Sequence, residues 1–313
     1  MKFIKGKKGA LSSATLVLIL VVLCVALAVV KPVFIKPTNL FNVLRTTSIT
    51  GLIAIGMTCV IITGGIDLSV GAVVGLSSVL CGILMKENGW PVFPALLVTV
   101  LVCLLVGLIN GVLIHYGKIP AFIATLGTMQ MSRGLAMFIT QGRTIPGLPQ
   151  EFTRFAQLKI LSLPSLFVVW VLVILVASYI LRYTRTGRNI YSIGSNMEAS
   201  RLSGIKLAPT ICFTYMFNAL CAALAGILLT ARITSAQPSA GEGYEMTAIA
   251  AAVIGGASLA GAEGTIIGTV LGACIMAVLQ NGGNLLGING FIMDIATGAL
   301  VVIAVLIEKN KKK

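Results

Sequence analysis

The sequence predicts an all-α integral membrane protein that crosses the bilayer about ten times. Three observations support this prediction: 57% of the 313 residues are hydrophobic, only 10% are charged, and the apolar residues form long uninterrupted runs. A water-soluble domain typically carries about 25% charged residues, so this composition cannot cover an ordinary water-facing surface. Helices that are apolar on all sides belong in lipid or in a core larger than this chain can build.

The apolar runs give the expected membrane spans in chain order. Each run approaches the roughly 20 residues that a helix needs to cross the hydrocarbon core, although several are short or broken by glycine. The first run is longer than the ~7–15 residue core of a signal peptide, and no cleavage site follows it, so we expect an uncleaved span. The expected spans are residues 11–30, 46–66, 67–85, 91–114, 119–140, 163–181, 207–231, 246–262, 265–286 and 290–307.

Charge asymmetry predicts the orientation of a single transmembrane domain that comprises residues 1–313. An even number of spans places both termini on one side. If that side is the inner one, fourteen Lys and Arg residues lie in inner segments and eight in outer segments. Positive residues concentrate in cytoplasmic loops, so we expect both termini in the cytoplasm. The inner segments are then the tails 1–10 and 308–313 and the loop 182–206.

The sequence lacks the motifs that are typical of several other classes of protein. No P-loop sequence and no GxSxG sequence occur, and His115 is the only histidine, so we expect neither catalytic residues nor a metal site. All seven cysteines lie inside apolar runs without a CxxC pair and are expected to be buried thiols. The net charge of +14 comes without basic residues interleaved with aromatic ones, which argues against a nucleic-acid partner. These observations favour a transporter or a channel.

The stretch ITGGIDLSVG at residues 62–71 holds the one charged residue among the forty between Arg45 and Lys86. A charge at membrane depth costs roughly 2.5–3.5 kcal/mol on insertion scales, so Asp67 needs a partner or water. In one interpretation, TGG breaks a helix and Asp67 caps the next helix by accepting the N–H of Ser69 or Val70. In a second interpretation, Asp67 lines a solute pathway at a discontinuous helix. Both interpretations stay open.

Other polar side chains within apolar runs are candidates for the same pathway. The stretch LQNGGNLLG at residues 279–287 clusters three amides, which suit an uncharged, hydroxylated solute because they donate and accept hydrogen bonds. Hydrogen bonding between helices is the alternative explanation. The candidate pathway residues are Thr63, Asp67, Asn110, Asn218, Gln280, Asn281 and Asn284.

The inner loop contains the sequence GSNMEASRLSGI, which predicts a short capped helix. Asn196 is a favourable N-cap, Glu198 lies in the first turn, and Gly204 can end the helix in the left-handed conformation. Met197, Leu202 and Ile205 would then form an apolar docking face for a partner protein. A merely solvated loop is the alternative.

Four stretches of the sequence are distinctive: AIGMTCVIITGGIDLSVG at 54–71, KIPAFIATLGTMQMSRGLAMFITQG at 118–142, GRNIYSIGSNMEASRLSGI at 187–205, and SAQPSAGEGYEMTAIAAAVIGGASLAGAEGTIIGT at 235–269. In these stretches, and over about residues 12–307, the chain resembles the permease subunits of bacterial ABC sugar importers of the ribose, galactose and xylose type. Small departures occur at Ser200, Ala257, Ala260 and Ala262, where alanine, threonine, serine and glycine are expected.

The resemblance implies a multi-pass protein of the bacterial cytoplasmic (inner) membrane, with a fold similar to that of the vitamin B12 importer permease. Two permease copies, or this chain and a homologous permease, would form the pore among membrane lipids. ATP and Mg would be bound by separate ATPase subunits and no cofactor by this chain. The ATPase would dock on residues 194–205, with the expected coupling residues Gly194, Asn196, Glu198, Ala199, Arg201, Leu202, Ser203, Gly204 and Ile205.

The resemblance also implies an extracytoplasmic binding protein that delivers a monosaccharide, a ribose-like pentose or a hexose, to the outer loops. The candidate docking residues in those loops are Arg143, Glu151, Gln237 and Glu242. Two alternatives stay open: a permease for a nucleoside or a sugar-like signalling molecule, and a secondary transporter coupled to protons through Asp67. The dependence of uptake on ATP distinguishes an ATP-driven importer from a proton-coupled carrier.

Overall fold

The computed structural model describes residues 13–160 and 162–311, and these are predominantly helical. The predicted tail 1–10 lies outside the described residues. Every predicted span overlaps one of the longer helices, which are α1 (Ser13–Val30), α2 (Pro37–Ile62), α3 (Val70–Gly82), α4 (Val92–His115), α5 (Ala121–Thr140), α7 (Ser165–Tyr183), α10 (Leu207–Ile233), α11 (Tyr244–Ile254), α12 (Ile266–Leu286) and α13 (Gly290–Lys311). Among the described residues, seven helices are long and apolar enough to cross a membrane.

Short elements connect the long helices. The helical ones are η1 (Pro32–Ile35), the π-helical turn η2 (Ile83–Glu87), α6 (Gln150–Gln157), α8 (Arg185–Ser195) and α9 (Met197–Leu202). The strands form two antiparallel pairs, β1 (Ile145–Pro146) with β4 (Ser235–Ala236), and β2 (Lys159–Ile160) with β3 (Leu163–Pro164).

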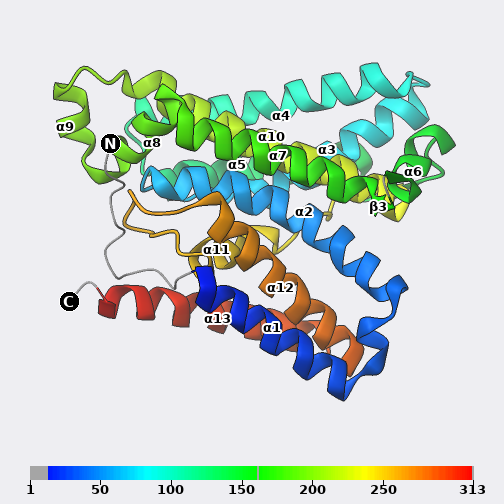
Figure 1. Cartoon of the computed structure of the whole chain (residues 1–313). Coiled ribbons are helices and arrows are strands. Elements are labelled where there is room, and N and C mark those ends of the chain that lie inside the picture. Colours follow the sequence, from blue (N-terminus) through cyan, green and yellow to red (C-terminus); the bar gives the residue numbers. More distant parts are fainter. Residues whose placement is uncertain (1–12, 161, 312–313) are drawn as a thin grey trace.

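The long helices lie roughly side by side, and the short elements gather at the two ends of the bundle (Figure 1). Helices α8 and α9 occupy one end, and α6 with β3 occupies the other. Helix α2 runs through the centre, where it packs against α7, α10, α11 and α12. Its residues from Thr47 to Ile62 are all buried, so this helix forms the middle of the core.

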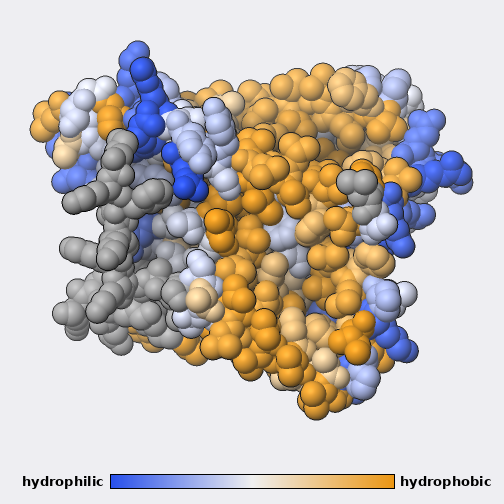
Figure 2. Space-filling view, in the orientation of Figure 1, coloured by the Kyte–Doolittle hydropathy of each residue, from blue (hydrophilic) through white to orange (hydrophobic). Residues whose placement is uncertain are grey.

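The surface carries an apolar band with hydrophilic residues at both ends (Figure 2). Large apolar side chains are widely exposed on the long helices, including Val29 on α1 and Phe93 on α4, which are both 77% exposed. Water would make such exposure costly, at about 25 cal/mol per Å² of apolar surface, whereas lipid tails solvate it. The described structure is therefore that of an all-α membrane protein.

Three predicted boundaries were wrong for local reasons. Helix α2 begins at Pro37 and not at residue 46, because proline suits the first helical turn and Asn39 is satisfied by a bond to Phe34 O at 3.0 Å. It ends at Ile62 because Gly64 adopts a φ of 81°. The predicted span 246–262 ends early at Ile254, because Gly256 has a φ of 91° and begins an irregular segment at 255–265.

The predicted inner loop 182–206 contains two helices, of which the sequence predicted only α9. Helix α8 was missed because its sequence, RTGRNIYSIGS, is short and mostly polar. Two local signals were present. Thr184 is an N-cap whose side chain accepts from Gly187 N at 3.2 Å, and Ile190 and Ile193 form a buried stripe on one helix face.

Candidate functional site

Asp67 lies in the buried turn between α2 and α3 and is 1% exposed. Its Oδ1 accepts hydrogen bonds from Ser69 N at 2.9 Å and from Ser69 Oγ at 2.6 Å. The predicted bond to the backbone N–H of Ser69 is therefore confirmed, although Ser69 and not Asp67 occupies the N-cap position of α3. Within residues 13–160 and 162–311, no Lys or Arg forms an ion pair with Asp67.

Neutral side chains from three further helices complete the surroundings of Asp67. Asn218 on α10 donates to Asp67 Oδ2 at 2.9 Å, and Asn110 on α4 donates to Ser69 Oγ at 3.0 Å. Thr128 on α5 donates to Asn110 Oδ1 at 2.7 Å. We call these five residues, Asp67, Ser69, Asn110, Thr128 and Asn218, the Asp67 cluster. It brings together three of the seven predicted pathway residues.

The Asp67 cluster joins four helices in the interior of the bundle. Asn110 and Asn218 are 0% exposed, so the cluster is closed to solvent in this conformation. Three donors satisfy the Asp67 carboxylate, which is how a buried polar group avoids a large desolvation cost. Asn218 Oδ1 is buried with no hydrogen-bond partner among the described residues. The geometry suits a structural link between α3, α4, α5 and α10.

The remaining predicted pathway residues lie elsewhere. Asn281 on α12 exchanges two hydrogen bonds with Asn39 on α2, at 3.0 and 2.9 Å, so the alternative of bonding between helices is confirmed for this residue. Thr63 donates to Val60 O at 2.7 Å within its own turn. Gln280 is partly exposed and Asn284 is exposed. The structure therefore does not gather the seven candidates at one place.

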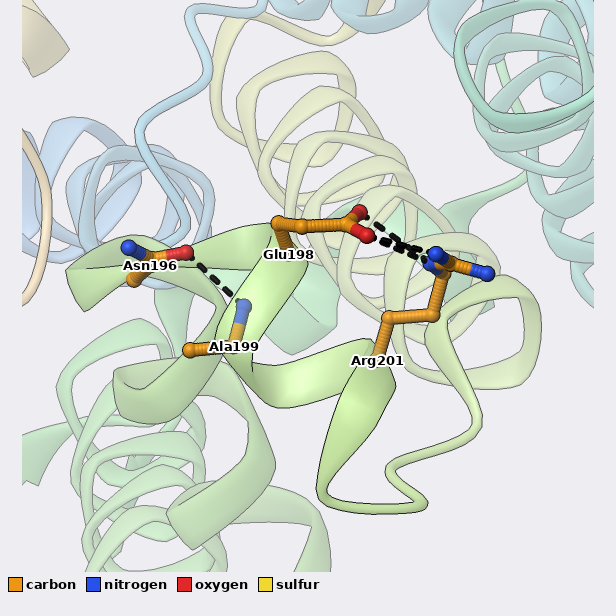
Figure 3. Close-up of polar contacts among 4 residues, drawn as sticks. All are labelled: Asn196, Glu198, Ala199 and Arg201. Carbon is orange, nitrogen blue, oxygen red and sulfur yellow. Dashed lines mark hydrogen bonds and ion pairs between the residues drawn. The ribbon is translucent and has the colours of Figure 1, made fainter.

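Helix α9 projects from the bundle as a capped helix (Figures 1 and 3). Asn196 Oδ1 accepts from Ala199 N at 2.9 Å, and Gly204 has a φ of 80°, which confirms both predicted ends. Glu198 and Arg201 form an ion pair at 2.5 Å on the exposed side, and the hydrogen bond from Arg201 lowers the pKa of Glu198 (Figure 3). Leu202 is 77% exposed and offers an apolar contact.

Helix α8 anchors α9 to the bundle. Tyr191 Oη donates to Gly264 O at 2.7 Å, and Ala262 N donates to Ile62 O at 2.9 Å. A Cβ added at Gly194 would overlap Ile62 O, so only glycine permits this approach. We call these five residues, Ile62, Tyr191, Gly194, Ala262 and Gly264, the junction. It joins the ends of α2 and α8 to the segment 255–265.

Of the predicted coupling residues, Gly194 lies in the junction, and Ser203 and Gly204 follow the last turn of α9. Ile205 N donates to Ser200 O at 3.1 Å, which closes the chain back onto the end of α9. Tyr191 was missed, because nothing in the local pattern indicates that its hydroxyl reaches a carbonyl 73 residues away. The glycines of GGASLAGAEG at 255–264 were the available signal of a close backbone approach.

The two predicted outer segments meet through β1 and β4, where Ile145 pairs with Ala236. Arg143 and Glu242 are exposed, and Glu151 lies in the first turn of α6. Gln237 N donates to Ser78 Oγ at 3.1 Å. The four predicted docking residues thus lie in segments that the strand pair brings to one end of the molecule.

Two residues on α5 lie outside the predicted pathway, coupling and docking sets. Arg133 donates to three carbonyls, Pro238 O at 2.5 Å, Ala240 O at 3.0 Å and Gly71 O at 3.2 Å, and so ties α5 to the segment after β4. Gln130 is exposed near the middle of α5, between Gly127 and Gly134, both of which have open space beside them. An exposed amide at this depth indicates a surface that does not face lipid tails.

These features define a multi-span membrane transport subunit: an apolar bundle, a closed polar cluster inside it, and a protruding capped helix at one end. The chain belongs to the family described as "Branched-chain amino acid transport system / permease component", which matches residues 39–307.

Several curated relatives match nearly the full length of the chain. The ribose import permease protein of Bacillus subtilis is 42% identical over 93% of this chain and 91% of the relative. The ribose import permease protein of Escherichia coli K12 is 40% identical over 94% of this chain and 92% of the relative. The D-allose transport system permease protein of Escherichia coli K12 is 34% identical over 88% and 85%. No solved structure matches the chain.

Proposed function

We propose that the chain is the membrane permease of an ABC importer that moves a monosaccharide, and that the solute is a ribose-like pentose. One observation carries the proposal: identity of 40% or more to ribose import permeases over more than nine-tenths of the chain. Matches to xylose and allose permeases at about 34% support the wider class of sugars. The chain is a transport component and not an enzyme, and its ATPase and substrate-binding partners are separate proteins.

We further propose a topology with ten membrane helices and both termini in the cytoplasm, in a fold like that of the vitamin B12 importer permease. Helix α1 begins and α13 ends at the end of the bundle that carries α8 and α9, which supports a common side for these elements (Figure 1). The positive-inside bias of the sequence makes that side cytoplasmic. The paired outer segments then face the binding protein.

A second permease copy is proposed to cover the exposed face of α5. Gln130 would be costly against lipid tails but can hydrogen-bond across an interface between helices. Gly127 and Gly134, on the same face, allow close approach of another helix. The pore would then lie between two subunits, with α5 beside it.

The junction supports a specific route for coupling. An ATPase that moves α9 would move α8, and α8 contacts the end of α2 and the segment 255–265 directly. Ile62 lies only five residues before Asp67, so movement of the α2 end reaches the Asp67 cluster through one short turn. We propose that the junction transmits movement and that the Asp67 cluster fixes the helices that move.

Reconstitution in vesicles tests the function. The chain, its ATPase and its binding protein are expected to support ribose uptake that requires ATP and stops when either partner is omitted. Uptake that follows a proton gradient and ignores the ATPase would favour a secondary transporter instead. Strong uptake of a nucleoside with no uptake of ribose would leave the importer class in place but overturn the proposed solute.

A further inference from the structure

A pocket of about 680 Å³ opens where α8 meets the first turns of α10. Three cationic side chains line it: Arg185 and Arg188 on α8, and Lys206 just before α10. All three are exposed, and none forms an ion pair within the described residues. No Asp or Glu of the described chain lines the pocket. The pocket therefore carries uncompensated positive charge.

The neutral lining of the pocket is divided between polar and apolar residues. Thr186 and Asn189 add hydrogen-bonding groups beside the two arginines. Pro209 and Phe213 form an apolar wall on the side of α10, and Phe213 stacks on Phe217 one turn further into the bundle, with ring centroids 6.1 Å apart. This lining suits an amphipathic anion, whose charged head would contact the cations and whose apolar portion would lie along α10.

The pocket lies at the edge of the predicted membrane. The spanning helix α7 ends at Tyr183, two residues before Arg185, and the spanning helix α10 begins at Leu207, directly after Lys206. Hydrophilic residues over α8 and α9 adjoin the apolar band in this region (Figure 2). Helix α8 also begins at Arg185, and the dipole at a helix N-terminus favours an anion there.

We infer that this pocket binds the headgroup of an anionic phospholipid, with the phosphate held by Arg185, Arg188 and Lys206 and the lipid tail lying along Phe213. Guanidinium groups bind phosphate through paired hydrogen bonds, and basic pockets between membrane helices are suited to anionic headgroups. Gly204 and Ile205, two of the expected coupling residues, also line the pocket, so its opening lies beside the surface that we propose for the ATPase. The inference needs only that the chain lies in a membrane and does not depend on the proposed solute.

Lipid binding to the purified full-length chain tests the inference. Phosphatidylglycerol retention is measured by native mass spectrometry and compared with that of phosphatidylcholine. The matched variants each lose three positive charges: Arg185→Gln/Arg188→Gln/Lys206→Gln in the pocket, and Lys309→Gln/Lys311→Gln/Lys312→Gln as control. Each cation near an anionic bilayer surface is worth about fivefold in affinity, so the pocket variant should bind phosphatidylglycerol on the order of a hundredfold more weakly. The control removes three cations that lie outside the pocket, so it should lose less affinity than the pocket variant.

Three results would overturn the inference. In the first, the pocket variant retains phosphatidylglycerol as well as the wild type does. In the second, inorganic phosphate displaces the lipid completely at equal concentration. In the third, the protein prefers phosphatidylglycerol over phosphatidylcholine only when the ATPase is present. If the triple variant does not fold, Lys206→Gln alone should weaken binding about fivefold, and an unchanged affinity would again contradict the inference. Because no transport is measured, these outcomes are independent of the uptake assay.

Discussion

At the scale of single residues, the buried polar groups are held by neutral partners. Asp67 receives three hydrogen bonds, and two of its neighbours in the cluster are fully buried amides. Asn110 lies 43 residues after Asp67 in the sequence, and Asn218 lies 151 residues after it. No local pattern could therefore have predicted that these side chains meet. What could be predicted was the turn itself, because TGG followed by Asp and Ser favours a helix break with a local cap.

Substitution of Asp67 by alanine should destabilise the protein more than it changes solute selectivity. The change leaves Ser69 and Asn218 with buried donors that have no acceptor. Each unsatisfied group should lower the free energy of unfolding by about 1–3 kcal/mol. We expect a lower folded yield and a lower thermal midpoint in detergent. Asp294→Ala on α13 is the control, since Asp294 is exposed. A fully stable Asp67→Ala protein with altered selectivity would instead establish Asp67 as a pathway residue.

Substitution of Tyr191 by phenylalanine should separate folding from coupling. It removes the hydroxyl that donates to Gly264 O and costs about 1 kcal/mol, which is too little to unfold the bundle. The expected result is normal ATP hydrolysis with less solute moved per ATP. Tyr179→Phe on the exposed face of α7 serves as the control. An unchanged ratio of uptake to hydrolysis in the Tyr191 variant would remove the junction from the coupling route.

At the scale of elements, the apolar pattern predicted each long helix but not all of its limits. Lipid and core both select apolar residues, so the pattern located the long helices without revealing that α2 extends through Asn39 and Arg45. The caps of α9 were predictable because Asn196 and Gly204 act within a few residues. Helix α8 was not, because its stability comes from packing against distant segments and not from its own sequence.

Reversal of one charge on α9 should weaken docking of the ATPase. Arg201→Glu places two carboxylates three residues apart and removes the only ion pair of the described residues. Assembly with the ATPase, measured by co-purification, should fall while the folded yield is kept. Arg154→Glu in the last turn of α6, at the opposite end, is the matched reversal. Equal loss of ATPase in both variants would contradict a specific role for α9.

The same ion pair predicts little effect of pH on docking near neutrality. Arg201 lowers the pKa of Glu198, so the carboxylate stays ionised at pH 7 and the pair is lost only as the pH falls through that lowered pKa. Co-purification with the ATPase should therefore be constant between about pH 6 and 8. A steep change in that range would assign docking to another group.

At the scale of the whole molecule, the account requires a second subunit against α5. A cysteine placed at Gln130 is expected to form a crosslink between two copies in the membrane, whereas a cysteine at Phe93 on the exposed face of α4 should not. Equal crosslinking at both positions, or none at Gln130, would place the interface elsewhere. The class of the protein followed from composition, and the charge distribution predicts its topology, but contacts between copies lie outside what one sequence encodes locally.

The central claim is that a membrane-embedded permease is driven from the cytoplasm through α9. Its most direct test is labelling of Ala199→Cys, in a background without the native cysteines, by a thiol reagent that does not cross membranes. The account predicts labelling from the cytoplasmic side only, with protection when the ATPase is bound. Labelling from the outer side, or labelling that the ATPase does not change, would contradict it.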